Sequence, residues 1–289
     1  MSAAAAAPAR SGGRAPEFAF GPEDHAAIAR LAYDEAGIVL AASKAQLVYG
    51  RLVRRLRACG EPSFAAYVAR IADDADERAR AVDALTTNHT SFFRESHHFD
   101  HLTAEAWPPL AKKLAAGGRV RAWSSACSSG EEPYTLMMAL AGRDKGAARA
   151  LATHDFRVLA TDLSASILAT AREGWYPHDT ARTIPADLAR LWTRPADGGV
   201  AIADELRAPV AFRQLNLTRD WPIRGRFDVI FCRNVMIYFD EPTKARLQAR
   251  LADRLEPGGF LYIGHSERLA ADVAPRFQCI GRTTYRKLA

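Results

Sequence analysis

The sequence has little that would support a disulfide framework or a metal centre. It contains four cysteines in 289 residues, and no two of them stand at the short spacing of a zinc site. His97 and His101 are one helical turn apart, but no third ligand is spaced nearby, so we expect no metal. Scattered cysteines of this kind are expected to be reduced and mostly buried. They are Cys59, Cys127, Cys232 and Cys279.

Long apolar runs are also lacking. No stretch approaches the roughly 20 apolar residues that a membrane span requires. The alanine-rich start lacks the charged-then-apolar order of a signal peptide. We therefore expect a cytoplasmic chain that is not inserted in a membrane. The sequence lacks the leucine-rich seam that would indicate an obligate dimer, so we expect a monomer.

Signatures of nucleic-acid binding are absent as well. The formal net charge of +6 at pH 7 favours an acidic partner, which can be nucleic acid, anionic lipid or protein. The interleaved aromatic and basic pattern of single-strand binders is missing, and no helix-turn-helix pattern is present. We therefore expect no nucleic-acid partner.

A helical region is the first recognisable part of the chain. Residues 1–15 are mostly Ala, Gly, Pro, Ser and Arg with almost nothing to bury, so we expect a disordered tail there. From Pro22 to Leu85 the apolar residues recur at helical spacing. Residues 16–90 are therefore expected to form a helical N-terminal domain of several short helices.

One predicted helix of this domain carries a concentrated positive charge. Four basic residues gather on it, and no acidic residue occurs between Glu35 and Glu61. This helix presents either a docking surface for an acidic partner or a solvated face with extended side chains. The four residues are Lys44, Arg51, Arg54 and Arg55.

Strands alternate with helices after Gly118. This alternation predicts a mostly parallel sheet that is covered by helices on both faces. The predicted strands span residues 120–124, 156–161, 227–232 and 260–264.

The rest of this region departs from a simple alternation. Residues 277–280 and 283–286 predict a hairpin that ends the sheet antiparallel, which is uncommon in dinucleotide-binding sheets. The stretch 174–210 is too long for a simple crossover and predicts an inserted subdomain. The second domain is expected to span residues 91–289.

A loop of small residues follows the first predicted strand. It runs from Ser125 to Gly130, and Glu131, Glu132 and Pro133 then open a predicted helix. Small residues let a nucleoside-like cofactor approach the backbone closely. The two acids would repel a pyrophosphate but attract a cationic amino or sulfonium group. Alternatively, this is a helix start whose acids complement the helix dipole.

Polar residues also follow the other predicted strands. Asp162 ends the second strand, where it can accept both ribose hydroxyls of a nucleoside or cap the next helix. Asn216 can hold an adenine edge beside the sheet. Arg233 and Asn234 interrupt an apolar strand at its carboxyl end, where such sheets bind ligands. The alternative interpretation of Arg233 and Asn234 is that they cap a loop.

A further polar cluster precedes the sheet, at residues 86–95. Asn88, Thr90 and Arg94 offer hydrogen bonds and a fixed positive charge that can bind the carboxylate of a cofactor. The aromatic pair at residues 92 and 93 would exclude water. The alternative is an interdomain linker anchored by the two aromatic rings.

Four segments, in this order, resemble the CheR chemotaxis receptor methyltransferases. They are residues 86–95, 126–134, 231–240 and 264–267, the last reading Gly-His-Ser-Glu. The resemblance runs from about residue 18 to about residue 287. It implies an α/β fold with a Rossmann-like, S-adenosylmethionine-dependent methyltransferase sheet, mostly parallel with an antiparallel C-terminal hairpin. An all-α N-terminal domain and a small inserted β-subdomain, here abbreviated, complete the implied fold.

The implied activity is that of a protein-glutamate O-methyltransferase in chemotaxis. S-adenosyl-L-methionine would methylate glutamate side chains on the cytoplasmic signalling domain of methyl-accepting chemotaxis receptors. Glutamate methyl esters and S-adenosyl-L-homocysteine would result, and the enzyme would be recruited to receptor arrays at the inner membrane face. The implied receptor-binding residues are Lys44, Arg51, Arg54 and Arg55.

The resemblance also implies a set of site residues. No acid or base catalyst is implied, because a glutamate is already ionised at neutral pH. Arg94, Arg233 and Asn234 would position the reactants. One of the adjacent acids Glu131 and Glu132 would cap the helix, and which of them binds the cofactor stays open. By matching motif positions, the cofactor would be bound by Asn88, Thr90, Arg94, Glu131, Asp162, Asn216, Leu217, Arg233 and Asn234.

Two other interpretations of the same residues stay open. The chain can be a methyltransferase for another protein or a small carboxylate. It can also be a non-catalytic module that binds S-adenosylmethionine and signals to a partner.

Overall fold

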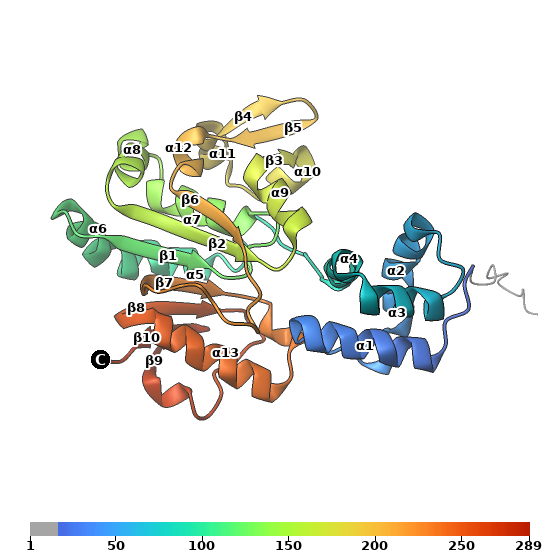
Figure 1. Cartoon of the computed structure of the whole chain (residues 1–289). Coiled ribbons are helices and arrows are strands. Elements are labelled where there is room, and N and C mark those ends of the chain that lie inside the picture. The colour runs from blue at the N-terminus through green and yellow to red at the C-terminus, as the bar shows by residue number, and fades with distance from the viewer. Residues whose placement is uncertain (1–16) are drawn as a thin grey trace, which may run out of the picture.

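The computed structural model describes residues 17–289, so the tail expected at residues 1–15 lies outside the described residues. Figure 1 shows a helical domain beside a larger α/β domain, with an extended segment running from α4 into the α/β domain. Within the described range no helix has the length and apolarity needed to cross a membrane.

The helical domain forms because its helices bury one apolar face each and have capped starts. The side chains of Ser63 and Asp74 accept hydrogen bonds from the backbone N–H groups of Ala66 and Glu77. The buried faces make a hydrophobic core separate from those of the sheet. The elements are α1 (Pro22–Ala36), η1 (Ala42–Lys44), α2 (Ala45–Cys59), α3 (Phe64–Asp73) and α4 (Ala75–Leu85).

One carboxylate is buried inside this domain. Glu77 is 1% exposed and accepts hydrogen bonds from Arg55 Nε at 2.9 Å and from the Tyr67 hydroxyl at 2.8 Å. Burial opposes ionisation of Glu77, but the hydrogen bonds from Arg55 and Tyr67 outweigh it and lower its pKa to about 2. The Arg55–Glu77 pair therefore ties α2 to α4.

The α/β domain is built on a seven-stranded sheet in the order β6-β2-β1-β7-β8-β10-β9. The first five are parallel, and β10 runs antiparallel to both β8 and β9. Each predicted strand is present, and β6 is an edge strand that the sequence patterns do not indicate. The strands are β1 (Val120–Ser124), β2 (Phe156–Asp162), β6 (Val210–Gln214), β7 (Phe227–Cys232), β8 (Leu255–Ile263), β9 (Phe277–Gly281) and β10 (Thr284–Lys287).

Alternating residues of the strands feed two hydrophobic cores on opposite faces of the sheet. Val229 and Phe231 belong to one core, and Ile230 and Cys232 belong to the other. Helices α5 to α9 contribute to the first core, and α13 covers the second face. These elements are α5 (His97–His101), η2 (Leu102–Ala106), α6 (Trp107–Ala115), α7 (Glu131–Ala141), α8 (Lys145–Thr153), α9 (Ala165–Glu173) and α13 (Glu241–Arg254).

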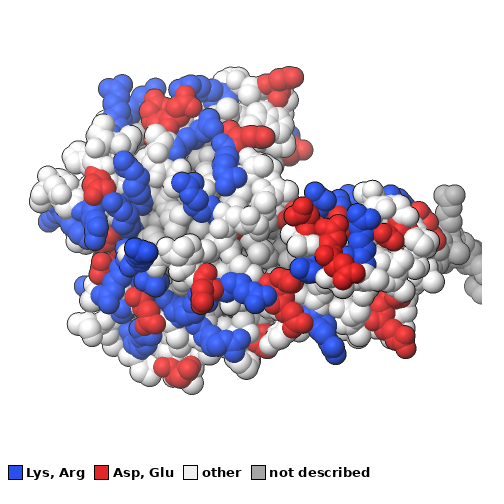
Figure 2. Space-filling view, in the orientation of Figure 1, with Lys and Arg blue, Asp and Glu red and all other residues white. Residues whose placement is uncertain are grey.

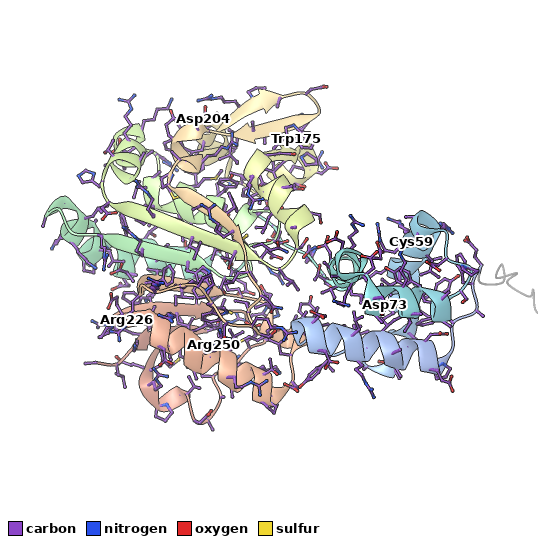
Figure 3. All side chains as sticks on the ribbon, viewed as in Figure 1. Cys59, Asp73, Trp175, Asp204, Arg226 and Arg250 are labelled. Atoms are coloured by element: carbon purple, nitrogen blue, oxygen red, sulfur yellow. The ribbon has the colours of Figure 1, made fainter. Side chains whose placement is uncertain are left out.

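A small subdomain is inserted between α9 and β6. It contains a three-stranded antiparallel sheet in the order β3-β5-β4, and Figure 3 labels Trp175 on it. Gly199 is confined there, because an added Cβ would lie 2.2 Å from the carbonyl oxygen of Tyr176. The elements are β3 (Trp175–Pro177), α10 (His178–Ala181), α11 (Ala186–Trp192), β4 (Thr193–Ala196), β5 (Gly199–Ile202) and α12 (Asp204–Arg207).

Polar contacts at the carboxyl end of α1 join the two domains. The Val39 N–H donates to the Tyr238 carbonyl at 2.9 Å, and Asn216 Nδ2 donates to the Glu35 carbonyl at 2.6 Å. Gly37 has a φ of 70°, and an added Cβ would lie 2.8 Å from a methyl group of the α/β domain. The close approach of the two domains therefore depends on a glycine at this helix end.

The expectation of mostly buried cysteines is half wrong. Cys127 and Cys232 are buried, but Cys279 is exposed and Cys59 is only half-buried. Cys279 lies on the edge strand β9, and Cys59 ends α2 in the helical domain (Figure 3). Neither position is covered on all sides by other elements.

We predict that Glu77→Gln destabilises the helical domain by roughly 2 to 3 kcal/mol, somewhat less than a fully buried pair costs because Arg55 is partly exposed. The pKa of Glu77 is lower in the folded chain, so the ionic contribution is complete above about pH 4.5 and is lost as the pH falls toward about 2. Thermal unfolding at pH 7 and pH 3 measures both effects.

Glu61→Gln is the matched control, because the Arg70 partner of Glu61 is exposed. We expect it to change the melting temperature little. Equal melting temperatures for Glu77→Gln and the parent chain at pH 7 would contradict the role of Glu77.

Candidate functional site

A hollow lies at the carboxyl ends of β1, β2 and β7, where the sheet meets the helical domain. It holds about 1010 Å³ free of protein atoms, part of it open to solvent. Its walls come from the end of α1, the segment after α4, the loop after β1 and the ends of β2, β6 and β7. We call this hollow the cavity. A hollow at this edge of a parallel sheet suits a nucleoside-like ligand.

The extended segment after α4 forms one polar wall. Asn88 Nδ2 donates to the Thr86 hydroxyl at 3.2 Å, and the Ser128 hydroxyl donates to the Asn88 carbonyl at 3.0 Å. Arg94 folds back and donates to the His89 carbonyl at 2.8 Å. All five residues line the cavity, so it receives a guanidinium and several uncharged polar groups from this side.

Asp162 ends β2 and bridges two backbone turns. Its carboxylate accepts hydrogen bonds from the N–H groups of Ser128 at 2.9 Å and Ser164 at 3.0 Å. Burial raises the pKa of Asp162, and the backbone hydrogen bonds oppose that rise. The Ser164 hydroxyl caps α9 by accepting from the Ile167 N–H. Asp162 is therefore not the cap of the next helix, which was its alternative interpretation.

The residues that follow β6 give the cavity an apolar wall. Leu215 and Leu217 line it. The side chain of Asn216 is engaged by the protein: Nδ2 donates to Glu35, and Oδ1 accepts from the Thr218 N–H at 2.9 Å. Asn216 therefore acts first as a connection between the domains.

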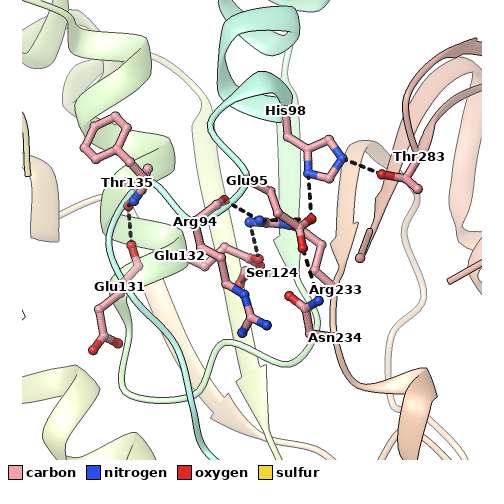
Figure 4. A network of polar contacts seen from close by, with 12 residues as sticks. Arg94, Glu95, His98, Ser124, Glu131, Glu132, Thr135, Arg233, Asn234 and Thr283 are labelled. Carbon is pink, nitrogen blue, oxygen red and sulfur yellow. Dashed lines mark hydrogen bonds and ion pairs between the residues drawn. The ribbon is translucent and has the colours of Figure 1, made fainter. Parts of the chain in front are cut away.

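A buried arginine connects the loops around the cavity (Figure 4). The Arg233 side chain is 2% exposed, and its Nη1 donates to Glu132 at 3.1 Å. Its Nη2 donates to the Arg94 carbonyl and lies 3.4 Å from Glu95 Oε2. The other carboxylate oxygen of Glu132 accepts from the Ser124 hydroxyl at 2.7 Å. Two carboxylates thus compensate one cation that water does not reach.

Glu95 extends this network to the end of β8. Its Oε1 accepts from Asn234 Nδ2 at 3.2 Å and lies 2.9 Å from Nδ1 of His265. Burial opposes ionisation of Glu95, but His265, Arg233 and Asn234 outweigh it and lower the pKa of Glu95 to about 2. An ionised Glu95 therefore holds three chain segments together.

The backbone of this network contains unusual conformations. Phe93, Glu95 and Asn234 have φ values of 54°, 55° and 57°, in the left-handed region that side chains with a Cβ disfavour. Each such residue costs on the order of 1 to 3 kcal/mol and persists only where its surroundings fix it. Gly264 packs on Asn234, since an added Cβ would lie 2.5 Å from Asn234 Nδ2. The positions of Arg94 and Asn234 are therefore set by tertiary contacts.

The cavity brings together eight of the nine residues predicted to bind a cofactor, and Glu131 is the exception. Glu131 accepts a hydrogen bond from the Ser129 hydroxyl at 2.6 Å, and Figure 4 shows its carboxylate directed away from the Arg233 network. Glu132 lines the cavity in its place, and its carboxylate accepts a hydrogen bond from Arg233. The eight residues are Asn88, Thr90, Arg94, Asp162, Asn216, Leu217, Arg233 and Asn234.

Several residues of the site were missed by sequence reasoning. Ile38, Leu85, Phe99 and Tyr238 line the cavity, but in sequence they resemble ordinary core residues. Glu95 was missed although it follows Arg94 directly. A charged residue inside a polar run that precedes two histidines was the available signal.

The four basic residues predicted to face a partner divide into two pairs. Arg51 donates to the carbonyl of the last residue of α4 at 2.5 Å and to the Thr87 hydroxyl at 2.7 Å. Arg55 is held by the buried carboxylate of α4. The side chains of Lys44 and Arg54 are exposed and form no hydrogen bond or ion pair with residues 17–289. Charge for a partner is therefore available at Lys44 and Arg54.

The cavity combines groups that suit a zwitterionic nucleoside better than a metal. Arg94 can bind a carboxylate, Asp162 can accept from a diol, and Leu217 offers an apolar surface for a base. Over residues 17–289, no three His, Cys, Asp or Glu side chains are grouped to hold a metal ion. His101 instead lies 2.9 Å from the hydroxyl of Tyr262 through Nδ1.

Comparison with known proteins identifies relatives over nearly the whole described chain. A family model described as "CheR methyltransferase, SAM binding domain" matches residues 88–286, and one described as "CheR methyltransferase, all-alpha domain" matches residues 23–86. Chemotaxis protein methyltransferase 2 of Pseudomonas aeruginosa is 41% identical over 93% of this chain and 94% of the relative.

Two further relatives carry the name chemotaxis protein methyltransferase. The protein of Klebsiella aerogenes is 42% identical over 89% of this chain and 87% of the relative. The protein of Escherichia coli is 39% identical over 89% of this chain and 88% of the relative.

We predict that Arg233→Met destabilises the chain by about 3 to 5 kcal/mol at neutral pH, because it leaves Glu132 and Glu95 buried without their cation. Burial already raises the pKa of Glu132, and loss of Arg233 would raise it further. A carboxyl whose pKa is raised by folding stabilises the fold at low pH and loses that effect as the pH rises. The deficit should therefore shrink between pH 7.5 and pH 5.5 in denaturant unfolding.

The control is Arg213→Met, at an exposed arginine of β6. It should unfold as the parent chain does at both pH values. A pH-independent deficit for Arg233→Met would indicate lost packing rather than uncompensated charge.

Proposed function

The chain belongs to the CheR methyltransferase family, and from this premise we propose that it methylates glutamate side chains of chemoreceptors with S-adenosyl-L-methionine as the donor. The products are glutamate methyl esters and S-adenosyl-L-homocysteine. The observation that carries the proposal is the cavity at the carboxyl edge of the parallel strands, with Asp162 and Arg94 in its walls.

The residues of the cavity fit this cofactor. The Arg94 guanidinium would bind its carboxylate, Asp162 would accept from its ribose hydroxyls, and Leu217 would contact its adenine. Small side chains at Ser125, Ala126 and Ser128 line the cavity and let such an occupant approach the backbone. Asn88, Thr90, Asn216, Arg233 and Asn234 complete the proposed binding set, and Glu132 replaces Glu131 in it.

The reaction needs little acid or base chemistry from the protein. The bound cofactor supplies an electrophilic methyl group on a sulfonium. A substrate glutamate has a reference pKa near ~4.3 and is already ionised at pH 7. Holding the carboxylate in line with the methyl group is then the main task, and such positioning supplies up to roughly 7 to 11 kcal/mol in well-aligned intramolecular models. Arg94 and Asn234, fixed by the Arg233 network, are the positioning residues.

The proposed substrate is the cytoplasmic signalling domain of a methyl-accepting receptor. The enzyme would act as a cytoplasmic monomer that is recruited to receptor arrays at the inner membrane face. Exposed Lys44 and Arg54 support an acidic protein partner near the cavity. On the face of the molecule shown in Figure 2, acidic side chains are interspersed among the basic ones. This mixed pattern supports a protein partner over nucleic acid.

The test is transfer of label to receptors. The chain is incubated with radiolabelled cofactor and receptor-containing membranes, and the labelled receptor is treated with mild alkali. A glutamate methyl ester releases volatile methanol, whereas methylated nitrogen does not. Membranes without receptors are the control. Alkali-stable label, or label that appears equally in both membranes, would contradict the proposal.

We predict that Arg94→Ala weakens cofactor binding by about 10- to 100-fold, the loss of one charge-assisted contact. The fold should be little changed, because the Arg94 side chain makes a single hydrogen bond to the His89 carbonyl. Calorimetric titration measures the affinity. Arg119→Ala, at an exposed arginine before the amino end of β1, is the control and should bind as the parent chain does. Unchanged affinity in Arg94→Ala would remove Arg94 from the site.

We predict that charge reversal separates Arg54 from its neighbour Arg55. Arg54→Glu should lower the rate of receptor methylation severalfold at low salt, with cofactor affinity and melting temperature unchanged, because its side chain is free. Arg55→Glu should lower the melting temperature, because it opposes the buried Glu77. Methylation rates at two salt concentrations and thermal unfolding distinguish the two. Equal turnover of Arg54→Glu and the parent chain at low salt would exclude Arg54 from receptor binding.

A further inference from the structure

Large hydrophobic side chains that stay exposed are few in residues 17–289, and three of them belong to segments next to residues that line the cavity. Val39 and Ile237 are each 49% exposed, and Leu47 is 41% exposed. We call these three residues the apolar rim. Single exposed apolar residues are normal on proteins, but a group of them beside polar residues marks an interaction site.

One backbone hydrogen bond joins the chain segments that carry two members of the rim. The Val39 N–H donates to the carbonyl of Tyr238, the residue that follows Ile237. Ile38 and Tyr238, their immediate neighbours in sequence, both line the cavity. The segments of Val39 in the helical domain and Ile237 in the α/β domain therefore lie side by side at the domain junction, next to two residues of the cavity wall.

Leu47 lies on the face of α2 that is directed to the cavity. Arg51, one turn later on the same face, donates to the Leu85 carbonyl and to the Thr87 hydroxyl. Both acceptors belong to residues that line the cavity. Lys44 and Arg54 flank Leu47 and Arg51 at helical spacing on this face, and both are exposed and unpaired within the described chain.

The surface thus combines an apolar rim with free positive charge. A partner that complements it carries apolar side chains next to the reacting glutamate and acidic side chains farther along. An amphipathic acidic helix meets both requirements, because residues three and four positions from a glutamate lie on the same helix face. A disordered acidic segment would not hold apolar groups at a fixed spacing from the reacting glutamate.

We propose that Val39, Leu47 and Ile237 form the seat of an acidic, amphipathic receptor helix whose glutamate enters the cavity. The seat rests on the proposed function, since it assigns a docking surface to the substrate of that same site. Apolar contacts at the rim supply affinity, and Lys44 and Arg54 attract the acidic part of the helix. The seat spans both domains, so the junction between them takes part in substrate recognition.

Serine substitutions test the seat, because they remove apolar surface without adding charge. The variants are Val39→Ser, Ile237→Ser and the double variant. Leu288→Ser is the matched control, since Leu288 is 48% exposed and lies at the far end of the sheet domain, next to β10. Val39→Leu and Ile237→Leu keep an apolar side chain and should retain activity.

Initial rates of receptor methylation are measured against receptor concentration in membranes, with labelled cofactor in excess. We expect kcat/KM to fall about 5- to 10-fold in each single serine variant and further in the double variant, as lost apolar burial on binding requires. The change should lie in KM for the receptor. Cofactor affinity by calorimetry and the melting temperature should match those of Leu288→Ser.

Two outcomes overturn the seat. Rates of the double variant within twofold of the parent chain would show that the receptor helix does not contact the rim. An equal loss of cofactor affinity or of melting temperature would show that these side chains serve the fold. If the parent chain and Leu288→Ser bind the cofactor but give no alkali-labile label on receptors, the proposed function fails, and the seat fails with it.

Discussion

The constraint on which the site depends is the burial of the Arg233 guanidinium. A cation removed from water must be compensated, and Glu132 and Glu95 supply that compensation from two different loops. The first residues of α7 and the segment around Arg94 are thereby drawn to the end of β7. The left-handed backbone at Glu95 and Asn234 is a consequence, since the network holds conformations that the isolated loops would not adopt. The loops that line the cavity are held in place by these ion pairs with Arg233.

The main features of the sheet and of the site could be predicted from sequence, and the reasons for success and failure are physical. Strands buried on both faces, such as β7, are mostly apolar runs that stand out in sequence, and in β7 only Asp228 interrupts the run. The edge strand β6 ends in exposed Arg213 and Gln214 and lacks that signal. Polar residues at the carboxyl ends of strands were correctly gathered at one edge, because all parallel strands of a sheet point the same way.

Local sequence patterns do not predict which charged residues form ion pairs when the partners lie far apart in the sequence. Glu131 and Glu132 are adjacent in sequence but about 100° apart around a helix, so only the fold decides which one meets Arg233. In the same way, Arg54 and Arg55 look equivalent in sequence. The partner of Arg55 lies 22 residues away on another helix, and it converts one of two similar arginines into a structural residue.

One wall of the cavity is formed by the helical domain and not by the sheet domain. Ile38 and Leu85 both belong to the hydrophobic core of the helical domain, and both also line the cavity. The two domains are therefore not interchangeable modules, because a helical domain grafted from another protein would have to reproduce this wall. Any change in the packing of α1 or α4 that displaces Ile38 or Leu85 therefore also changes the shape of the cavity.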